Sequence, residues 1–485
     1  MKHKKWAAAL ALAALVLCML PTAAFAAEEP LGERLPLWSV IPFVGMLLSI
    51  AIFPLVKAEW WEKNQGKVAV AWALVFVVPF FFAYGGQITI YELIHSIALD
   101  YWPFLLLLFA LYAVAGGIVV RGSLAGTPKV NMVIMMLGTM LASVIGTTGA
   151  AMLLIRPLLR ANSWRVRKVH TPIFFIFLVC NIGGCLTPVG DPPLFMGFLR
   201  GIPFFWTTTH LLPEFLFNAI ILLIIYFIVE TRAYKKDLAE GDQPELDGEK
   251  LRVEGLHNII FIAMILAGVV LSGVLSKSAM FLDAAGAVKG ITLYTMPGED
   301  ALVYTYPNLI RDIILLIAAF LSLKTTSKES RAYNNFNWGA IEEVAKLFFG
   351  IFITMIPALA LLATHGPQLG LDTPAKLFWA TGLLSGFLDN TPTYLVFLTT
   401  ACSLGTTGIT TTIGSLAPHL LSAVSTGAVF MGALSYIGNA PNFMVRSIAE
   451  EAKIKMPSFF GYMAWSFGIL VPVFIVDTIV FMILM

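Results

Sequence analysis

The sequence predicts an all-α integral membrane protein built from two inverted repeats. Of its 485 residues, 58% are hydrophobic and 12% are charged, whereas a soluble domain is about 25% charged. Many apolar runs approach the roughly 20 residues that a helix needs to cross a bilayer. One of these runs is interrupted by proline and glycine, and a similar interruption returns later in the chain. Each repeat is predicted to contain three spans, a re-entrant hairpin, a broken helix and a final span. The whole chain then has about ten spans and two hairpins.

Residues 1–26 have the features of a secretory signal peptide. Three of the first five residues are lysines, an apolar run follows, and Ala24-Phe25-Ala26 fits an A-x-A cleavage site. The alternative is an uncleaved first span. Either interpretation places residue 30 outside the cytoplasm.

The first repeat is predicted to cover residues 37–230. Its apolar segments lie at 37–56, 67–85, 103–120, 131–146, 149–159, 171–200 and 209–230. Basic residues mark cytoplasmic loops, and the most basic loop of this half is 160–168. The connection 86–102 has no Lys or Arg, so it is assigned to the outside. Basic residues flank both ends of 131–159, which is therefore predicted to be a hairpin that enters from the cytoplasm and turns at 146–149.

A polar linker, 231–255, is predicted to join the repeats in the cytoplasm. The second repeat covers 256–485, with apolar segments at 256–276, 306–323, 338–364, 376–402, 416–445 and 458–482. Segment 376–402 has no basic loop at either end, so we expect a second hairpin that enters from outside and turns at 389–392. Five crossings per half is an odd number, so the second half is predicted to be inverted relative to the first. The two hairpin tips would then meet near the middle of the membrane.

The stretch Thr187–Met196 interrupts an apolar segment with three prolines, a glycine and an aspartate. Proline removes a backbone donor and breaks a helix, and broken backbone at membrane depth occurs where it is buried in protein or lines a wet cavity. A related stretch, Ser435–Met444, follows about 250 residues later, with Gly438 in place of Gly190 and Asn439 in place of Asp191. Such a repeated interruption is the best sequence indication of a transporter's binding site.

Four interrupted, polar points converge in this arrangement: 146–149, 187–193, 389–392 and 435–442. They supply free carbonyls for a small cation and positive helix N-termini for an anion. Hard cations such as sodium prefer oxygen ligands, by analogy with calcium and magnesium. The residues predicted to bind sodium or substrate are Thr147, Thr148, Thr187, Asp191, Asp389, Asn390, Thr391, Ser435 and Asn439. No cofactor is predicted.

Asp191 and Asp389 are the predicted proton carriers. A carboxylate inside a membrane is costly and indicates function by default. It can hold either a proton or a metal cation, which is the minimum chemistry of a cation/proton exchanger. The alternative is that each aspartate caps a helix N-terminus, because Pro192 follows Asp191 directly and Pro392 lies shortly after Asp389. The two roles are compatible.

Other polar residues have ordinary structural interpretations. Arg311 and Asp312 are expected to form a local ion pair or an interface anchor. Lys346 is expected to pair with Glu342 or Glu343 one turn earlier. Asp477 is isolated in the last span, where we expect a structural hydrogen bond. The four cysteines are interpreted as small buried apolar residues.

Two short motifs resemble the ion transporter superfamily, which includes divalent anion/sodium symporters, citrate carriers, arsenite pumps and NhaD-type sodium/proton antiporters. Gly190-Asp191-Pro192-Pro193 resembles the element after the first hairpin, and Asp389-Asn390-Thr391-Pro392 resembles the hairpin tip of the antiporter branch. The resemblance implies inverted repeats, a homodimer and elevator-type alternating access. The dicarboxylate branch carries Ser-Asn-Thr at both tips, whereas this chain has Gly146-Thr147-Thr148 and Asp389-Asn390-Thr391. An aspartate there would repel a carboxylate and attract a cation.

The sequence therefore predicts a multi-pass secondary transporter of a bacterial inner membrane that exchanges sodium for protons. The first alternative is a sodium- or proton-coupled carrier of citrate, a dicarboxylate or another anion. A membrane-embedded enzyme or sensor is the second, but the sequence contains no H-E-x-x-H or G-x-S-x-G motif. The predicted partners are the lipid bilayer, sodium and protons, and a carboxylate under the first alternative; nothing indicates nucleic acid.

Overall fold

The structure, a computed structural model, describes residues 29–122, 124–241 and 252–484. Most of this chain is helical, and many of its helices are long and apolar enough to cross a membrane. The predicted all-α integral membrane class is therefore confirmed. The predicted signal peptide lies outside the described residues, as does the middle of the predicted linker.

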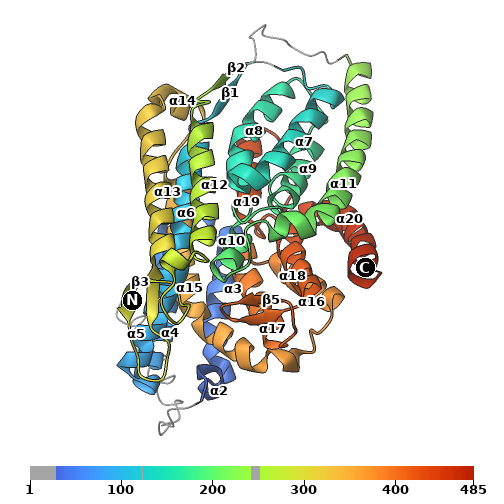
Figure 1. Cartoon of the computed structure of the whole chain (residues 1–485). Helices are drawn as coiled ribbons and strands as arrows, with labels where there is room; N and C mark the ends of the chain where they lie inside the picture. The colour runs from blue at the N-terminus through green and yellow to red at the C-terminus, as the bar shows by residue number, and fades with distance from the viewer. Residues whose placement is uncertain (1–28, 123, 242–251, 485) are drawn as a thin grey trace, which may run out of the picture.

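The first three spans of each half pack into one body (Figure 1). In the first half these are α3 (Ile41–Val56) with the short η1 (Leu37–Val40) before it, α4 (Ala58–Tyr84) and α6 (Trp102–Ala115). In the second half they are α12 (Asn258–Leu275), α13 (Tyr306–Thr325) and α15 (Gly339–His365). The helix α15 packs against α4, and α13 packs against both α12 and α6. The two halves thus share one hydrophobic interface.

The prediction that residues 86–102 form a connection between two spans is wrong. The helix α5 (Gly86–Ile94) continues through the π-helical η2 (His95–Tyr101) into α6, so the third span begins at the preceding turn. No proline or glycine interrupts residues 87–102, and the missing positive charge does not by itself end a helix. The hydroxyl groups of Ser96 and Tyr101 donate to backbone carbonyls of α15 at 2.8 and 2.9 Å, which holds this segment in the helical body.

Two helix pairs occupy the places predicted for the hairpins. The first pair is α7 (Pro128–Ile145) and α8 (Thr147–Ala161), which turn at Gly146 with a φ of 80°, a value that suits glycine. The second is α16 (Pro374–Ser385) and α17 (Asn390–Ser403). Figure 1 shows the first pair in the upper part of the molecule and the second pair in the lower part. The pairs therefore approach the middle from opposite ends.

Each predicted broken helix is broken. The first runs through α9 (His170–Leu178), η3 (Ile182–Gly184) and α10 (Pro192–Leu199), and the second through α18 (Pro418–Met431), η6 (Gly432–Leu434) and α19 (Ala440–Glu451). Residues 173–179 are all fully buried, as expected for a helix that is apolar on every face. Within the breaks themselves, Asp191 and Ser435 are also fully buried, so both breaks lie in the interior of the protein.

The last helices of the halves are α11 (Trp206–Ala239) and α20 (Phe459–Asp477), the latter continued by the π-helical η7 (Thr478–Ile483). Among the described residues, nine helices are long and apolar enough to span a membrane, and α7 is one of them. The other eight are the eight unbroken spans of the prediction. Because α7 is about 27 Å long, its length alone permits a crossing. What favours a hairpin is that the turn at its end meets the first break, where the amide of Thr147 donates to the carbonyl of Gly190 at 2.9 Å.

Three small antiparallel ribbons and several short helices were not predicted. The strands are β1 (Val119–Arg121) with β2 (Arg252–Glu254), β3 (Gly290–Tyr294) with β4 (Leu302–Thr305), and β5 (Ile409–Thr411) with β6 (Gly414–Leu416). The short helices are α2 (Leu31–Arg34), α14 (Lys328–Tyr333), η4 (Ala279–Phe281) and η5 (Gly366–Leu369). The predicted linker at 231–255 also needs correction, because its first part continues α11 to Ala239 and its last part forms β2.

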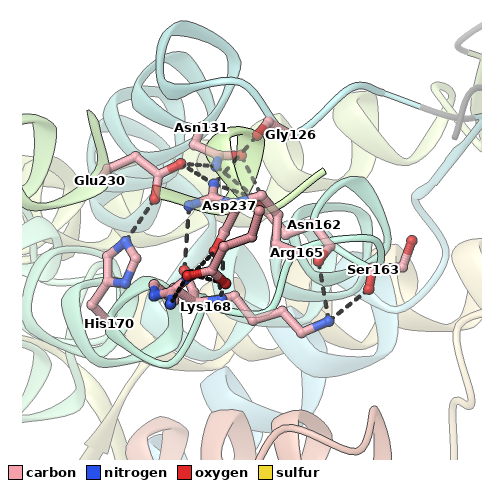
Figure 2. Close-up of polar contacts among 11 residues, drawn as sticks. Gly126, Asn131, Asn162, Ser163, Arg165, Lys168, His170, Glu230 and Asp237 are labelled. Atoms are coloured by element: carbon pink, nitrogen blue, oxygen red, sulfur yellow. Dashed lines mark hydrogen bonds and ion pairs between the residues drawn. The ribbon is translucent and has the colours of Figure 1, made fainter. Parts of the chain in front are cut away.

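The loop between α8 and α9 is tied to α11 by a buried charge network (Figure 2). Arg165 is 2% exposed and donates to Glu230 at 2.5 Å and to Asp237 at 2.6 Å. The other Glu230 oxygen lies 2.6 Å from Nε2 of His170. Asn131 of α7 donates to the Glu230 oxygen that Arg165 contacts, at 2.8 Å. This network fixes the open ends of α7, α8 and α9 against α11.

Candidate functional site

The two breaks share one local geometry, which follows from their repeated sequence. In the first break, the amide of Val189 donates to the Thr187 hydroxyl at 3.2 Å. In the second, the amide of Ile437 donates to the Ser435 hydroxyl, also at 3.2 Å. The residues that precede α10 and α19 have nearly the same extended conformation, with φ and ψ of −136° and 136° in one case and −148° and 139° in the other.

Both turns also require glycine for the same reason. A Cβ atom on Gly190 would lie 2.3 Å from the carbonyl oxygen of Gly184, and one on Gly438 would lie 2.5 Å from that of Gly432. Both contacts are with backbone, which cannot rotate away. The breaks are therefore closed, specific turns that carry Asp191 and Asn439 at equivalent positions.

Asp191 is the centre of the site. Its side chain is fully buried and accepts three hydrogen bonds from neutral groups. Thr147 and Asn439 donate to Oδ1 at 3.2 and 3.3 Å, and Asn390 donates to Oδ2 at 2.9 Å. The structure thus brings together four of the nine residues predicted from the sequence, one from each interrupted point.

Four helix N-termini meet at this carboxylate. Thr147 is the first residue of α8 and Asn390 the first of α17, while Asp191 and Asn439 directly precede α10 and α19. These helices contain between 8 and 15 residues. A helix N-terminus carries roughly half a positive charge, and four of them create a positive field around one buried carboxylate. The site therefore stabilises negative charge without a basic side chain.

Two asparagines that the sequence analysis missed hold the breaks together. Asn181 donates to Asn442 Oδ1 at 2.8 Å, and Asn442 donates to the carbonyls of Gly432 and Ser435 at 2.8 and 3.0 Å. Asn439 also donates to the carbonyl of Cys180 at 3.0 Å. Asn181 is a lone amide in an apolar run, and Asn442 lies within the repeated stretch. Both positions could therefore have been identified from the sequence as candidate site residues.

The other predicted residues lie apart from the central carboxylate. Asp389 is partly exposed and caps α17, where its Oδ1 accepts from the amide of Thr391 at 3.0 Å. Its capping role is thus present, and it does not bond to Asp191. Thr187 and Ser435 stabilise the turns described above, and Thr148 is half-buried beside the first tip.

Polar residues outside the central site form local pairs. Arg311 and Asp312 form an ion pair at 2.8 Å, and Lys346 pairs with Glu342 at 3.2 Å, as predicted. Asp477 accepts a hydrogen bond, as expected, from Asn218. The three cysteines among the described residues are buried and free, and in that part of the chain no group of three or more His, Cys, Asp or Glu side chains is placed to hold a metal ion.

The chain matches a known protein family over almost its whole length. The model of the family described as "Putative citrate transport" matches residues 32–482. The chain belongs to this transporter family. It is also 27% identical over 297 residues to proteins named uncharacterized transporters in Mycobacterium tuberculosis and Mycobacterium bovis. That match covers 55% of this chain and 66% of each relative. Family membership supports a multi-pass membrane transporter over an enzyme or sensor.

Proposed function

We propose that this transporter exchanges sodium for protons at Asp191. The observation that carries the proposal is a fully buried carboxylate held only by neutral donors. In its ionised form it has one negative charge to neutralise, so one sodium ion or one proton satisfies it, but not both. Competition of two cations for one charge is the basis of exchange.

The surrounding oxygen atoms suit this role. The hydroxyls of Thr147 and Thr148 would contribute to a sodium shell. The amide oxygens of Asn390 and Asn439 would complete it once these amides, whose NH2 groups now face Asp191, turn over. Asp389 of the hairpin tip would act as a second proton carrier at the edge of the site. Thr187, Thr391 and Ser435 would hold the turns that present these groups.

Alternating access would move this site between the two sides of a bacterial inner membrane. The two halves would act as inverted repeats in a homodimer, with the first three spans of each half as the static body. The broken helices and hairpins, which share the central hydrogen bonds, would move together. The matching geometry of the two turns supports this division.

Purified protein in liposomes tests the proposal. A pH gradient is imposed and followed with a pH-sensitive dye while chloride salts of sodium, lithium, potassium or choline are added. Sodium should collapse the gradient in the wild type, and Asp191→Asn should fall to the rate of empty liposomes. Asp372→Asn, an exposed aspartate on the same fold, is the matched control and should keep the wild-type rate. The proposal fails if no monovalent metal cation collapses the pH gradient or if Asp191→Asn still exchanges sodium for protons.

A sodium- or proton-coupled carboxylate carrier is the second candidate. The four helix N-termini favour this candidate, because their combined positive charge exceeds the single negative charge of one carboxylate. The description of the family as citrate transport favours it as well. Uptake of labelled citrate into the same liposomes, driven by a sodium or a proton gradient, distinguishes the candidates. Citrate uptake together with no citrate-independent sodium/proton exchange would replace the first candidate with this one.

A further inference from the structure

A second buried acidic pair lies apart from Asp191, between the last helices of the two halves. Glu214 of α11 and Asp477 of α20 are 3% and 0% exposed. Asn218, one helical turn after Glu214, donates to Asp477, so the two acids lie beside each other. In Figure 1, α11 and α20 lie next to each other beside α18. The helix α11 packs against both α20 and α18. Each acid therefore belongs to a different half.

Asn218 contacts both acids. Its amide donates to Oδ1 of Asp477 at 2.5 Å and to the backbone carbonyl of Glu214 at 2.9 Å, which uses both of its hydrogens. Three buried atoms of the cluster have no partner in the described part of the chain, namely Glu214 Oε1, Asn218 Oδ1 and Asp477 Oδ2. With both amide hydrogens of Asn218 in use, all three of these oxygen atoms can only accept a hydrogen bond while the acids are ionised. What the cluster lacks is a hydrogen to donate, and buried polar groups without partners require an explanation.

The neighbouring hydroxyl does not supply that hydrogen. Thr426 of α18 lies beside the Glu214 carboxyl group, but its hydroxyl donates to the carbonyl of Ser422 at 2.9 Å. While that bond is made, Thr426 can only accept a hydrogen bond from a protonated Glu214. The surroundings therefore complement one carboxylic acid and one carboxylate.

No cation compensates the pair within the described residues. The basic groups of α11, α16 and α18 are all exposed, namely His210, Arg232, Lys235, Lys236, Lys376 and His419. The buried His170 of the neighbouring α9 pairs with Glu230 instead. The other titratable group that faces the pair is the buried thiol of Cys185. Two carboxylates in contact and out of water cannot both ionise without a cation, so such pairs share a proton.

We propose that Glu214 and Asp477 form a proton-binding site, separate from Asp191, that holds one proton and releases it to water during the transport cycle. On release the O–H bond breaks, its electrons stay on the carboxyl oxygen, and the charge of the pair changes from −1 to −2. The acids sit on α11 and α20, so a change in how these two helices pack while the broken helices and hairpins move would separate them and allow both to ionise. Only this coupling to transport rests on the proposed function; binding of the proton does not.

Infrared spectroscopy of the purified full chain tests proton binding directly. The wild type should show a carbonyl band of a protonated, buried carboxylic acid at neutral pH that disappears at alkaline pH. Glu214→Gln and Asp477→Asn should each remove this band, because an amide hydrogen replaces the shared proton, and both variants should keep the fold for the same reason. Asp191→Asn and the exposed control Glu342→Gln should keep it. Absence of the band, or its persistence when each amide change is made in Asp191→Asn protein, would overturn the site.

Transport then tests coupling. The dependence of the transport rate on pH is measured in liposomes for the wild type, Glu214→Gln and Glu342→Gln, with sodium and with citrate as substrates. We expect Glu214→Gln to shift the pH of half-maximal rate by at least about one unit, with the control unchanged. An unaltered profile in Glu214→Gln alongside a lost infrared band would show a purely structural proton and overturn the coupling. If neither substrate is transported by the wild type, the function proposed for Asp191 fails while the infrared result on the pair stands.

Discussion

Exchanging Asp191 and Asn439 is the sharpest test of the central site. The side chains sit at equivalent positions of two similar turns, and Asn439 donates to Asp191 at 3.3 Å. Asp191→Asn leaves one acceptor oxygen for three donors, so an amide hydrogen then faces another donor. Loss of one or two hydrogen bonds to a charged group, at about 1.5–3 kcal/mol each, destabilises the fold by about 1.5–6 kcal/mol.

The reverse single change is costly for another reason. Asn439→Asp places two carboxylates in contact, and at an effective dielectric constant of about 20 their repulsion is roughly 5 kcal/mol before a proton is taken up. The double variant restores one amide opposite one carboxylate. We therefore expect the sum of the stability losses in the two single variants to exceed the loss in the double variant by at least about 2 kcal/mol.

Unfolding by titration with sodium dodecyl sulfate in mixed micelles measures all three variants against the wild type, and the liposome assay measures exchange. Asp372→Asn again serves as the surface control. A coupling free energy within about 0.5 kcal/mol of zero would refute the contact. A double variant less stable than either single variant would refute the equivalence of the two turns.

Three other predictions use the same unfolding assay. Gly190→Ala should lower the free energy of unfolding by about 1–3 kcal/mol, because its methyl group would meet the Gly184 carbonyl oxygen; unchanged stability would contradict the tight turn. Arg165→Met should lower it by about 3–5 kcal/mol, because two buried carboxylates lose their partner; a neutral effect would contradict the network in Figure 2. Hydrogen bonding to Arg167 lowers the pKa of Glu240 below its ordinary value. The Glu240–Arg167 pair therefore stabilises the fold fully above the ordinary pKa, and this contribution is lost as the pH falls through the lowered pKa. Glu240→Gln should therefore flatten the acid side of the stability profile below about pH 4.5, and an unchanged profile would contradict the pair.

The repeated stretch predicted the geometry at Asp191 well because turn chemistry is local. Proline, glycine and a hydroxyl residue at matching positions define the same turn in both halves. Asp389 shows the limit of this reasoning. A carboxylate at a hairpin tip points either to the tip's own amides or across the site, and only the packing of α17 decides between them.

Long-range partners were the part that the sequence did not indicate. Arg165 looked like one more basic residue of a cytoplasmic loop, but α11 continues to Ala239 and brings Glu230 and Asp237 beside it. Glu214 and Asp477 are far apart in the chain, and neither has a local motif. Their contact depends on how α11 and α20 cross, which hydrophobic periodicity does not specify.

The division of donors around Asp191 has a consequence for biogenesis. Thr147 is made before Asp191, whereas Asn390 and Asn439 leave the ribosome much later. A nascent first half, already inserted, therefore holds a membrane-buried acid with one of its three partners. We expect that half to stay hydrated at its centre, and to be a target for quality-control proteases, until the second half inserts. Two separately expressed halves should accumulate only when they are produced together.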